Sequence, residues 1–295
     1  MAAMPALLSI PSQTELKRIT LRSRRLVTGD LLGQYRSAFR GTGLVYTDIR
    51  AYQPGDDVKH IHWKATARTN TVFVKSYEED RQLRVFLAVD TSASMRAPHA
   101  TEAFAKALEF SSLVGALTQR GNDQLGLMLF GDKVTSYLPP KSGRKRNMQV
   151  LSQLMAEHDH SSATDLAGGL RHIATMLRKP SIVFVLSDFV SAPFQGDLKT
   201  ICARHDVVLV QIQTPLELLP SLGMVLFTDA ESGSQVTVDT SNSGVRRRWS
   251  ALLEEQREKL RGVARDAGAD HIVIHDNASR PLVQLMRERA TRGPR

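Results

Sequence analysis

Four short runs of apolar residues constrain the fold of this 295-residue chain more than any other feature. Each run is a near-continuous series rich in valine, leucine and isoleucine, a pattern typical of strands that are buried on both faces. Segments with helical periodicity separate the runs, which favours a mostly parallel sheet covered by helices on both sides. The four runs are RVFLAVD at 84–90, DQLGLMLFG at 123–131, SIVFVLSDF at 181–189 and DVVLVQIQT at 206–214.

Other kinds of segment are predicted outside these four runs. Two strand-like runs flank residues 231–234 and predict a β-hairpin, and the two prolines that close KVTSYLPP indicate an edge strand. The expected fold class is therefore an α/β, doubly wound, mostly parallel sheet with a small N-terminal β-containing block and a hairpin insertion. We predict four segments: an N-terminal helix plus a small β-rich block at 1–82, the core at 83–215, the hairpin at 216–245, and a helix–strand–helix that completes the core at 246–295.

The net charge of +9 is unevenly distributed. Residues 1–84 carry 14 Lys and Arg against 8 Asp and Glu, and residues 280–295 carry five Arg against one Glu. Such a surface could meet nucleic acid, acidic lipid or an acidic protein, or could simply be solvated. Neither zinc-finger spacing nor an aromatic-rich RNA-binding motif accompanies the charge, which argues against nucleic acid. Peripheral contact with a membrane stays open.

The cysteine content and the lack of long apolar segments indicate the cellular compartment. Cys202 is the single cysteine, which fits a reducing environment. No apolar run approaches the ~18–20 residues that span a bilayer. The first residues lack the basic-then-apolar order of a secretory signal. We expect a cytoplasmic protein without a transmembrane segment.

Small oxygen-bearing side chains gather where the predicted strands end. Asp90, Ser92 and Ser94 follow the first run, Thr164 lies just before a helix, and Asp188 ends the third run. Ligands bind at the carboxyl ends of strands in such sheets, and a hard divalent cation prefers oxygen ligands. Only two members are carboxylates, so an ion would keep water or take an oxygen from a partner. The alternative is that the aspartate and serines only cap the next helix.

These motifs, DTSASM, ATDLAGGL and LSDF, resemble the metal-ion-dependent adhesion site of the von Willebrand factor A fold. The resemblance covers about residues 84–215 and extends towards 290. It implies that Ser92, Ser94 and Thr164 ligate Mg²⁺ or Mn²⁺, while Asp90 and Asp188 support the ion largely through water and hydrogen bonds. A fold that keeps the loop but holds little or no metal is the alternative.

The preceding block, residues 41–80, resembles the signature of the bacterial domain of unknown function 58 family. The resemblance implies a MoxR-type AAA+ ATPase as partner and an adaptor-like or chaperone-like role. Many relatives carry N-terminal membrane helices, which this sequence lacks. The matching pieces are Gly41-x-Gly43, Arg50-x-Tyr52, Pro54-Gly55-Asp56-Asp57, Ile61-x-Trp63 and Ala67-Arg68.

Enzymatic readings find little support. The sequence has no Walker phosphate-binding loop and no nucleophile elbow, and a nucleophilic Ser92 or Ser94 would need a positioned histidine base. We therefore predict a non-enzymatic, divalent-cation-dependent adaptor that binds an acidic side chain of a client protein or works with the ATPase. The alternative is a basic scaffold, associated with nucleic acid or a membrane surface and independent of metal.

Two histidines and one tryptophan of the N-terminal block could bind metal or anchor the fold. His60 and His62 would share one face of a strand and could bind zinc, but no third ligand of matching type is nearby. We expect ordinary surface histidines. We expect Trp63 to anchor the core or a domain interface, because large amphipathic rings are usually buried there.

Overall fold

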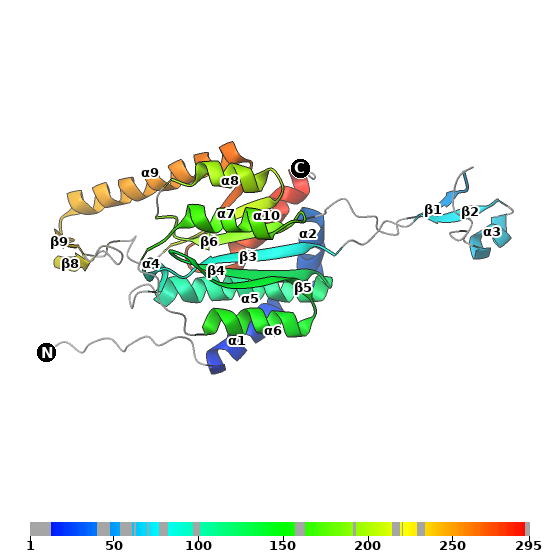
Figure 1. The fold of residues 1–295 in the computed structure, drawn as a ribbon, viewed down its shortest axis with the longest axis horizontal. Helices are drawn as coiled ribbons and strands as arrows, with labels where there is room; N and C mark the ends of the chain where they lie inside the picture. Colours follow the sequence, from blue (N-terminus) through cyan, green and yellow to red (C-terminus); the bar gives the residue numbers. More distant parts are fainter. Residues whose placement is uncertain are drawn as a thin grey trace.

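A six-stranded sheet forms the centre of the protein in the computed structural model (Figure 1). The strand order is β10-β7-β6-β3-β4-β5, and all neighbours are parallel except β4 and β5. The predicted fold class, a doubly wound and mostly parallel α/β sheet, is confirmed. The strands are β3 (Arg84–Asp90), β4 (Gln124–Phe130), β5 (Val134–Ser142), β6 (Ile182–Ser187), β7 (Asp206–Ile212) and β10 (Asp270–Ile274). The structure describes residues 13–39, 48–53, 61, 63–69, 71–76, 82–96, 101–156, 163–190, 193–213, 219, 221–228 and 234–292.

Helices cover both faces of this sheet. One layer holds α1 (Gln13–Leu26), α2 (Gly29–Ala38), α5 (Thr101–Gly121), α6 (Arg144–Met155) and α10 (Ser279–Arg292). The other holds α7 (Leu166–Met176), α8 (Gln195–Cys202) and α9 (Ser243–Ala267). A single turn, α4 (Ala93–Arg96), follows β3.

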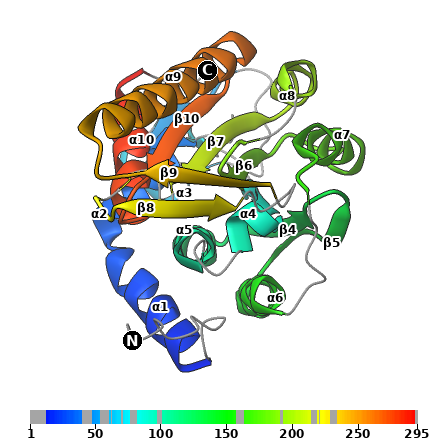
Figure 2. The ribbon, with the colours of Figure 1, turned by 90° about the vertical axis from the view of Figure 1, so that its left-hand side faces the viewer.

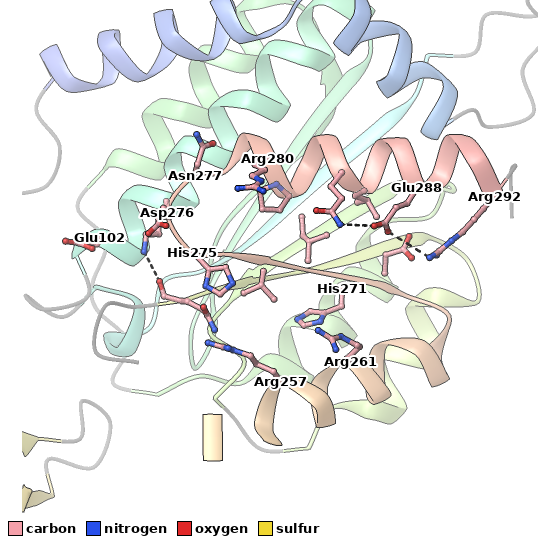
Figure 3. Close-up of a pocket in the computed structure, with 18 residues that line it drawn as sticks. Glu102, Arg257, Arg261, His271, His275, Asp276, Asn277, Arg280, Glu288 and Arg292 are labelled. Atoms are coloured by element: carbon pink, nitrogen blue, oxygen red, sulfur yellow. Dashed lines mark hydrogen bonds and ion pairs between the residues drawn. The ribbon is translucent and has the colours of Figure 1, made fainter. Parts of the chain in front are cut away.

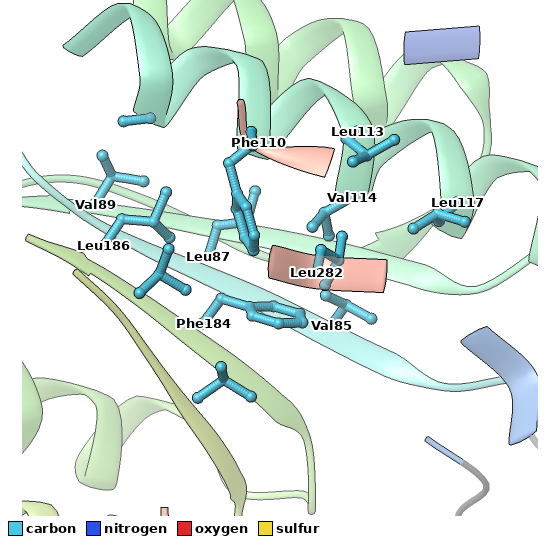
Figure 4. Close-up of a cluster of buried hydrophobic side chains, with 14 of the residues drawn as sticks. Val85, Leu87, Val89, Phe110, Leu113, Val114, Leu117, Phe184, Leu186 and Leu282 are labelled. Atoms are coloured by element: carbon cyan, nitrogen blue, oxygen red, sulfur yellow. The ribbon is translucent and has the colours of Figure 1, made fainter. Parts of the chain in front are cut away.

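Alternation of side chains along β3 explains the two layers. Successive residues of a strand point to opposite faces, so Val85 and Leu87 pack in the first layer, whereas Phe86 and Ala88 pack in the second. All four are fully buried. Figure 4 shows the α5 side chains, including Phe110, above the β3 residues of the first layer.

The expected N-terminal helix is in fact two helices. Val27 and Thr28 separate α1 from α2, and the Thr28 side chain accepts a hydrogen bond from the amide of Leu31, which caps the second helix. Both helices pack on the core, α1 against α5 and α2 against α10. A small unit follows, in which β1 (Asp48–Ala51) pairs with β2 (Phe73–Ser76) and α3 (Trp63–Thr69) contacts β2. Figure 1 shows this unit apart from the sheet.

The prediction for Trp63 is wrong, because its side chain is 69% exposed within the chain. His60, His62 and the signature piece Pro54-Gly55-Asp56-Asp57 lie outside the described residues. No helix among the described segments is long and apolar enough to cross a membrane. The boundaries of the four predicted segments stay predictions.

The expected hairpin consists of β8 (Met224–Thr228) and β9 (Gln235–Asp239), paired antiparallel. Phe227 stacks on Trp249 of α9, with ring centroids 6.1 Å apart, which attaches the hairpin to that helix. Figure 2 shows the hairpin at the end of the molecule that carries α4. The helix α9 ends at Gly268, whose φ of 80° is the left-handed conformation that glycine tolerates. The strand β10 then rejoins the sheet, as predicted, and the structure places it at the edge.

Candidate metal site

The chain changes direction between β3 and β6, the two strands at the centre of the sheet. The crossover that leaves β3 runs through α5 on one face, and the crossover that leaves β6 runs through α8 on the other. Diverging crossovers leave a crevice outside the carboxyl ends of adjacent strands, where α/β proteins bind ligands. Asp90 ends β3 and Asp188 follows β6, so both carboxylates lie at this crevice.

Asp90 is fully buried and held at both carboxylate oxygens. Its Oδ1 accepts a hydrogen bond from the amide of Ser92 at 2.9 Å, and its Oδ2 accepts one from the Ser187 hydroxyl at 2.7 Å. The next residue is fixed to the neighbouring strand, because the amide of Thr91 donates to the carbonyl of Phe130 at 2.8 Å. The carboxylate is therefore oriented before any ligand arrives.

The two serines lie together beside this carboxylate. The Oγ atoms of Ser92 and Ser94 are 3.1 Å apart, with Ser92 fully buried and Ser94 half-buried. Of the expected capping bonds, the structure shows Asp90 accepting from the Ser92 amide, but the helix that follows is the single turn α4. Capping of so short a helix does not explain why two hydroxyls and a buried carboxylate converge.

Asp188 is positioned by a tight turn after β6. Its Oδ1 accepts a hydrogen bond from the amide of Val190 at 3.1 Å, and the amide of Phe189 donates to Ser187 Oγ at 3.0 Å. Phe189 takes a left-handed conformation with a φ of 59°, which is uncommon for such a residue. The turn brings the second carboxylate to within 3.5 Å of the Ser187 hydroxyl.

Ser187 was not among the predicted site residues. Its hydroxyl lies between the two carboxylates and has a single proton, which the 2.7 Å contact assigns to Asp90. The only signal in the sequence is its place directly before Asp188. Because side chains alternate along a strand, nothing in the pattern distinguishes it from a residue that points into the core.

Burial sets the electrostatics of the pair. Burial, reinforced by the nearby charge of Asp188, raises the pKa of Asp90 from 3.8 to about 6, although the hydrogen bonds from Ser92 and Ser187 oppose the shift. Burial also raises the pKa of Asp188, against hydrogen bonds from Val190, Ser94 and Ser187. Within the described segments neither carboxylate forms an ion pair. A cation placed here would offset this uncompensated negative charge.

Thr164 lies at the same end of the sheet, on the neighbouring loop. The amide of Asp165 donates to the carbonyl of Gly131 at 2.8 Å, which ties the loop to the end of β4. Asp165 also caps α7, since its Oδ1 accepts from the amide of Gly168 at 2.8 Å. Thr164 itself is half-buried. The structure thus brings Asp90, Ser92, Ser94 and Asp188 together and places Thr164 beside the adjacent strand.

The donors of this cluster suit a hard cation. All are oxygen atoms of carboxylates or hydroxyls, the type that Mg²⁺ and Mn²⁺ bind. In the described part of the chain, no three His, Cys, Asp or Glu side chains are grouped so that they could hold a metal ion by themselves. An ion at this site would therefore depend on hydroxyl oxygens, on water and on an oxygen from outside the chain. The assignment of the five residues as a metal site stays a prediction.

Comparison with known proteins finds similar chains whose activities are not described. The chain is 29% identical over 223 residues to the uncharacterized protein Rv1480 of Mycobacterium tuberculosis, covering 74% of this chain and 70% of the relative. It is 26% identical over 138 residues to the uncharacterized protein YeaD of Bacillus subtilis, covering 47% and 32%.

Similar solved structures include a von Willebrand factor type A protein from Catenulispora acidiphila, with 11% identity, a TM-score of 0.42 and coverage of 75% of this chain and 43% of that one. A second is the proximal thread matrix protein 1 of the mussel byssus with a zinc-occupied MIDAS motif, with 18% identity, a TM-score of 0.36 and coverage of 45% and 38%. The model of one family, described as proteins of unknown function DUF58, matches residues 48–259, and this chain belongs to that family.

Proposed function

We propose that this protein is a non-enzymatic adaptor that binds a partner protein through a divalent cation, Mg²⁺ or Mn²⁺, at the carboxyl ends of β3 and β6. One observation carries the proposal. Asp90 is fully buried, and its pKa is raised to about 6 by burial and by the charge of another carboxylate, Asp188. A folded protein retains such a carboxylate pair at a cost, which a bound cation would offset.

The residues of the cluster would have different roles in binding the ion. Ser92, Ser94 and Thr164 supply hydroxyl oxygens that would hold the ion, and Asp90 and Asp188 supply the negative charge around it. Ser187 keeps Asp90 in a single orientation through the 2.7 Å hydrogen bond. The ion, when bound, supplies a positive charge and an open coordination position.

That open position suits an acidic side chain of a partner protein. Because neutral hydroxyl oxygens would contact the ion and the two aspartates would support it largely through water, the ion would keep an attraction for a carboxylate at its open position, and that attraction would be stronger where docking excludes water. We propose a MoxR-type AAA+ ATPase, or a client that it acts on, as the source of this side chain. The partner follows from the family resemblance, and we place the complex in the cytoplasm.

Thermal unfolding tests the metal site directly. An ion that binds only the folded state at 100 times its Kd stabilises it by about 2.7 kcal/mol. We expect Mg²⁺ or Mn²⁺ to raise the Tm of the wild type and EDTA to reverse the rise. Asp90→Ala should abolish the effect, and so should Asp90→Asn, which keeps the shape of the side chain. Asp266→Ala, which removes an exposed carboxylate on α9, should respond like the wild type.

Titration calorimetry with the purified ATPase from the same organism tests the partner. We expect binding in Mg²⁺ and none in EDTA or with the Asp90 variants. Binding that survives both EDTA and Asp90→Asn would refute the cation-dependent mechanism and favour the metal-independent scaffold. If the wild type also shows no Tm response to either ion, the site itself is refuted.

A further inference from the structure

A groove of about 1070 Å³ runs along the outer edge of the sheet, at β10, which β7 separates from β6 in the strand order. Its floor is the strand β10, and its walls are α9 and α10 (Figure 3). The groove is lined by basic side chains from both helices and shares no residue with the cluster around Asp90.

At the outer edge of β10, no backbone pairing is seen with any strand that the structure describes. Among the described strands β10 pairs only with β7. The amide of Gln213 donates to the carbonyl of Ile274 at 3.1 Å, so Ile274 and, by alternation, Ile272 direct their backbone groups toward β7. The N–H and C=O groups of His271 and Val273 therefore point away from the sheet and into the groove, which both residues line.

The opposite edge of the sheet is protected against strand addition, and this edge is not. The strand β5 carries Pro139, Pro140 and Lys141, residue types that natural proteins use to block pairing at exposed edges. The strand β10 reads Asp-His-Ile-Val-Ile and contains neither proline nor lysine. A second strand could pair with β10 but not with the proline-bearing part of β5.

The charges of the α9 wall match an extended acidic chain. Arg257 and Arg261 line the groove one helical turn apart, a rise of about 6 Å along the helix axis. Alternate residues of a strand are about 6.6 Å apart and share one face, so two acidic residues separated by one residue would meet both arginines. Arg261 pairs with Glu258 on the helix surface, with both side chains more than half exposed, and such exposed pairs are weak. Arg257 is more buried and pairs with Glu254, whose side chain is exposed.

Four acidic residues line the groove beside five basic ones, and two of the four, Asp270 and Glu288, already face arginines; the other two are Glu102 and Asp276. Asp270 is bound by Arg289, with Nη2 2.5 Å from Oδ2, and Glu288 lies 4.0 Å from Arg292. The α10 wall also contributes Arg280, which lines the groove.

We propose that β10 binds an extended segment of a partner protein as an additional strand, with acidic residues at two alternate positions of that segment facing Arg257 and Arg261. Backbone hydrogen bonds to His271 and Val273 would provide affinity, and the arginines would select the sequence. This docking site is independent of the cation proposed above.

Fluorescence anisotropy with a labelled peptide, VTVEVEVT, measured in EDTA, tests the proposal separately from the metal site. A matched peptide, VTVKVKVT, is the charge control. We expect the acidic peptide to bind and the basic one not to bind. Arg257→Ala with Arg261→Ala should weaken binding at least about tenfold, a loss of about 1.4 kcal/mol. Arg247→Ala, on the same helix outside the groove lining, should leave binding unchanged.

Val273→Pro tests the backbone contribution. Proline is tolerated in an edge strand where the lost N–H faced outward, so the variant should fold and lose the peptide, while Val273→Thr should keep it. Should the proline variant fail to fold, hydrogen exchange of the wild type decides, because peptide binding should slow exchange of the Val273 amide. Equal binding of both peptides, failure of the acidic peptide to bind, or binding without amide protection would each overturn the proposal. Light scattering that shows dimers formed through this edge would assign it to a second copy instead and overturn it too.

Discussion

Acidification should destabilise this protein through His271, whose imidazole is largely buried against the sheet. Its Nε2 lies 3.2 Å from Gln211 Oε1. Burial, with a further contribution from the positive charge of Arg261, lowers the pKa of His271 from 6.5 to about 4. The folded protein therefore keeps this histidine neutral under mildly acidic conditions in which the unfolded chain already protonates it.

The sign and size of the effect follow from proton linkage. Between the two pKa values, about 4 folded and 6.5 unfolded, the unfolded state binds more protons, so the free energy of unfolding falls as the pH falls. Above the unfolded value His271 contributes nothing to this dependence. At about pH 5 the linkage relation gives a loss of about 2 kcal/mol relative to neutral pH, and it grows to about 3 kcal/mol below the folded value.

Urea denaturation from about pH 7.5 to about pH 4.5 measures this loss. Other groups titrate in the same range, including His275, whose pKa is lowered by burial and by Arg257. The useful quantity is therefore the difference between the wild type and His271→Gln, a variant that removes the titrating group and keeps a polar side chain beside Gln211. We expect this difference to change by about 2 kcal/mol in favour of the variant between neutral pH and about pH 5. A difference that stays constant across the range would refute the reasoning.

Two further variants test the packing of the sheet. Gly126→Ala should destabilise by about 1–3 kcal/mol in urea denaturation, because its Cβ would lie 2.6 Å from Phe86 Cδ2 and 2.9 Å from the carbonyl oxygen of Leu138; an unchanged midpoint would contradict this. Arg289→Ala should cost about 3–5 kcal/mol, since it removes the guanidinium that binds the largely buried Asp270; a loss below about 1 kcal/mol would show that the pair contributes little.

The central strands could be predicted because burial on both faces requires apolar residues at consecutive positions. The strands at the edges of the sheet were predicted from other signals. The prolines of β5 predicted an edge strand, and the late run at 270–274 was expected to rejoin the sheet, as it does. Oxygen-bearing residues after two such strands then predicted which loops would meet, because parallel strands end on one side.

Long-range contacts were beyond the reach of these patterns. Periodicity shows that a face is buried but not which element covers it, so the packing of α1 on α5 and of α2 on α10 came only from the structure. Residue type likewise does not show whether another element covers a side chain. Trp63 was expected to be buried because it is a large aromatic residue, but it is exposed.

The sequence by itself determined the alternation of strands and helices, the protected edge, and the five candidate ligands at the ends of the strands. Only the tertiary structure decided that Ser187 joins the two carboxylates and that burial raises the pKa of Asp90. The groove between α9 and α10 likewise exists only where segments far apart in sequence pack together. Local sequence patterns reflect which residues suit a strand or a helix. Electrostatic interactions and grooves depend instead on distances between residues that only the complete fold determines.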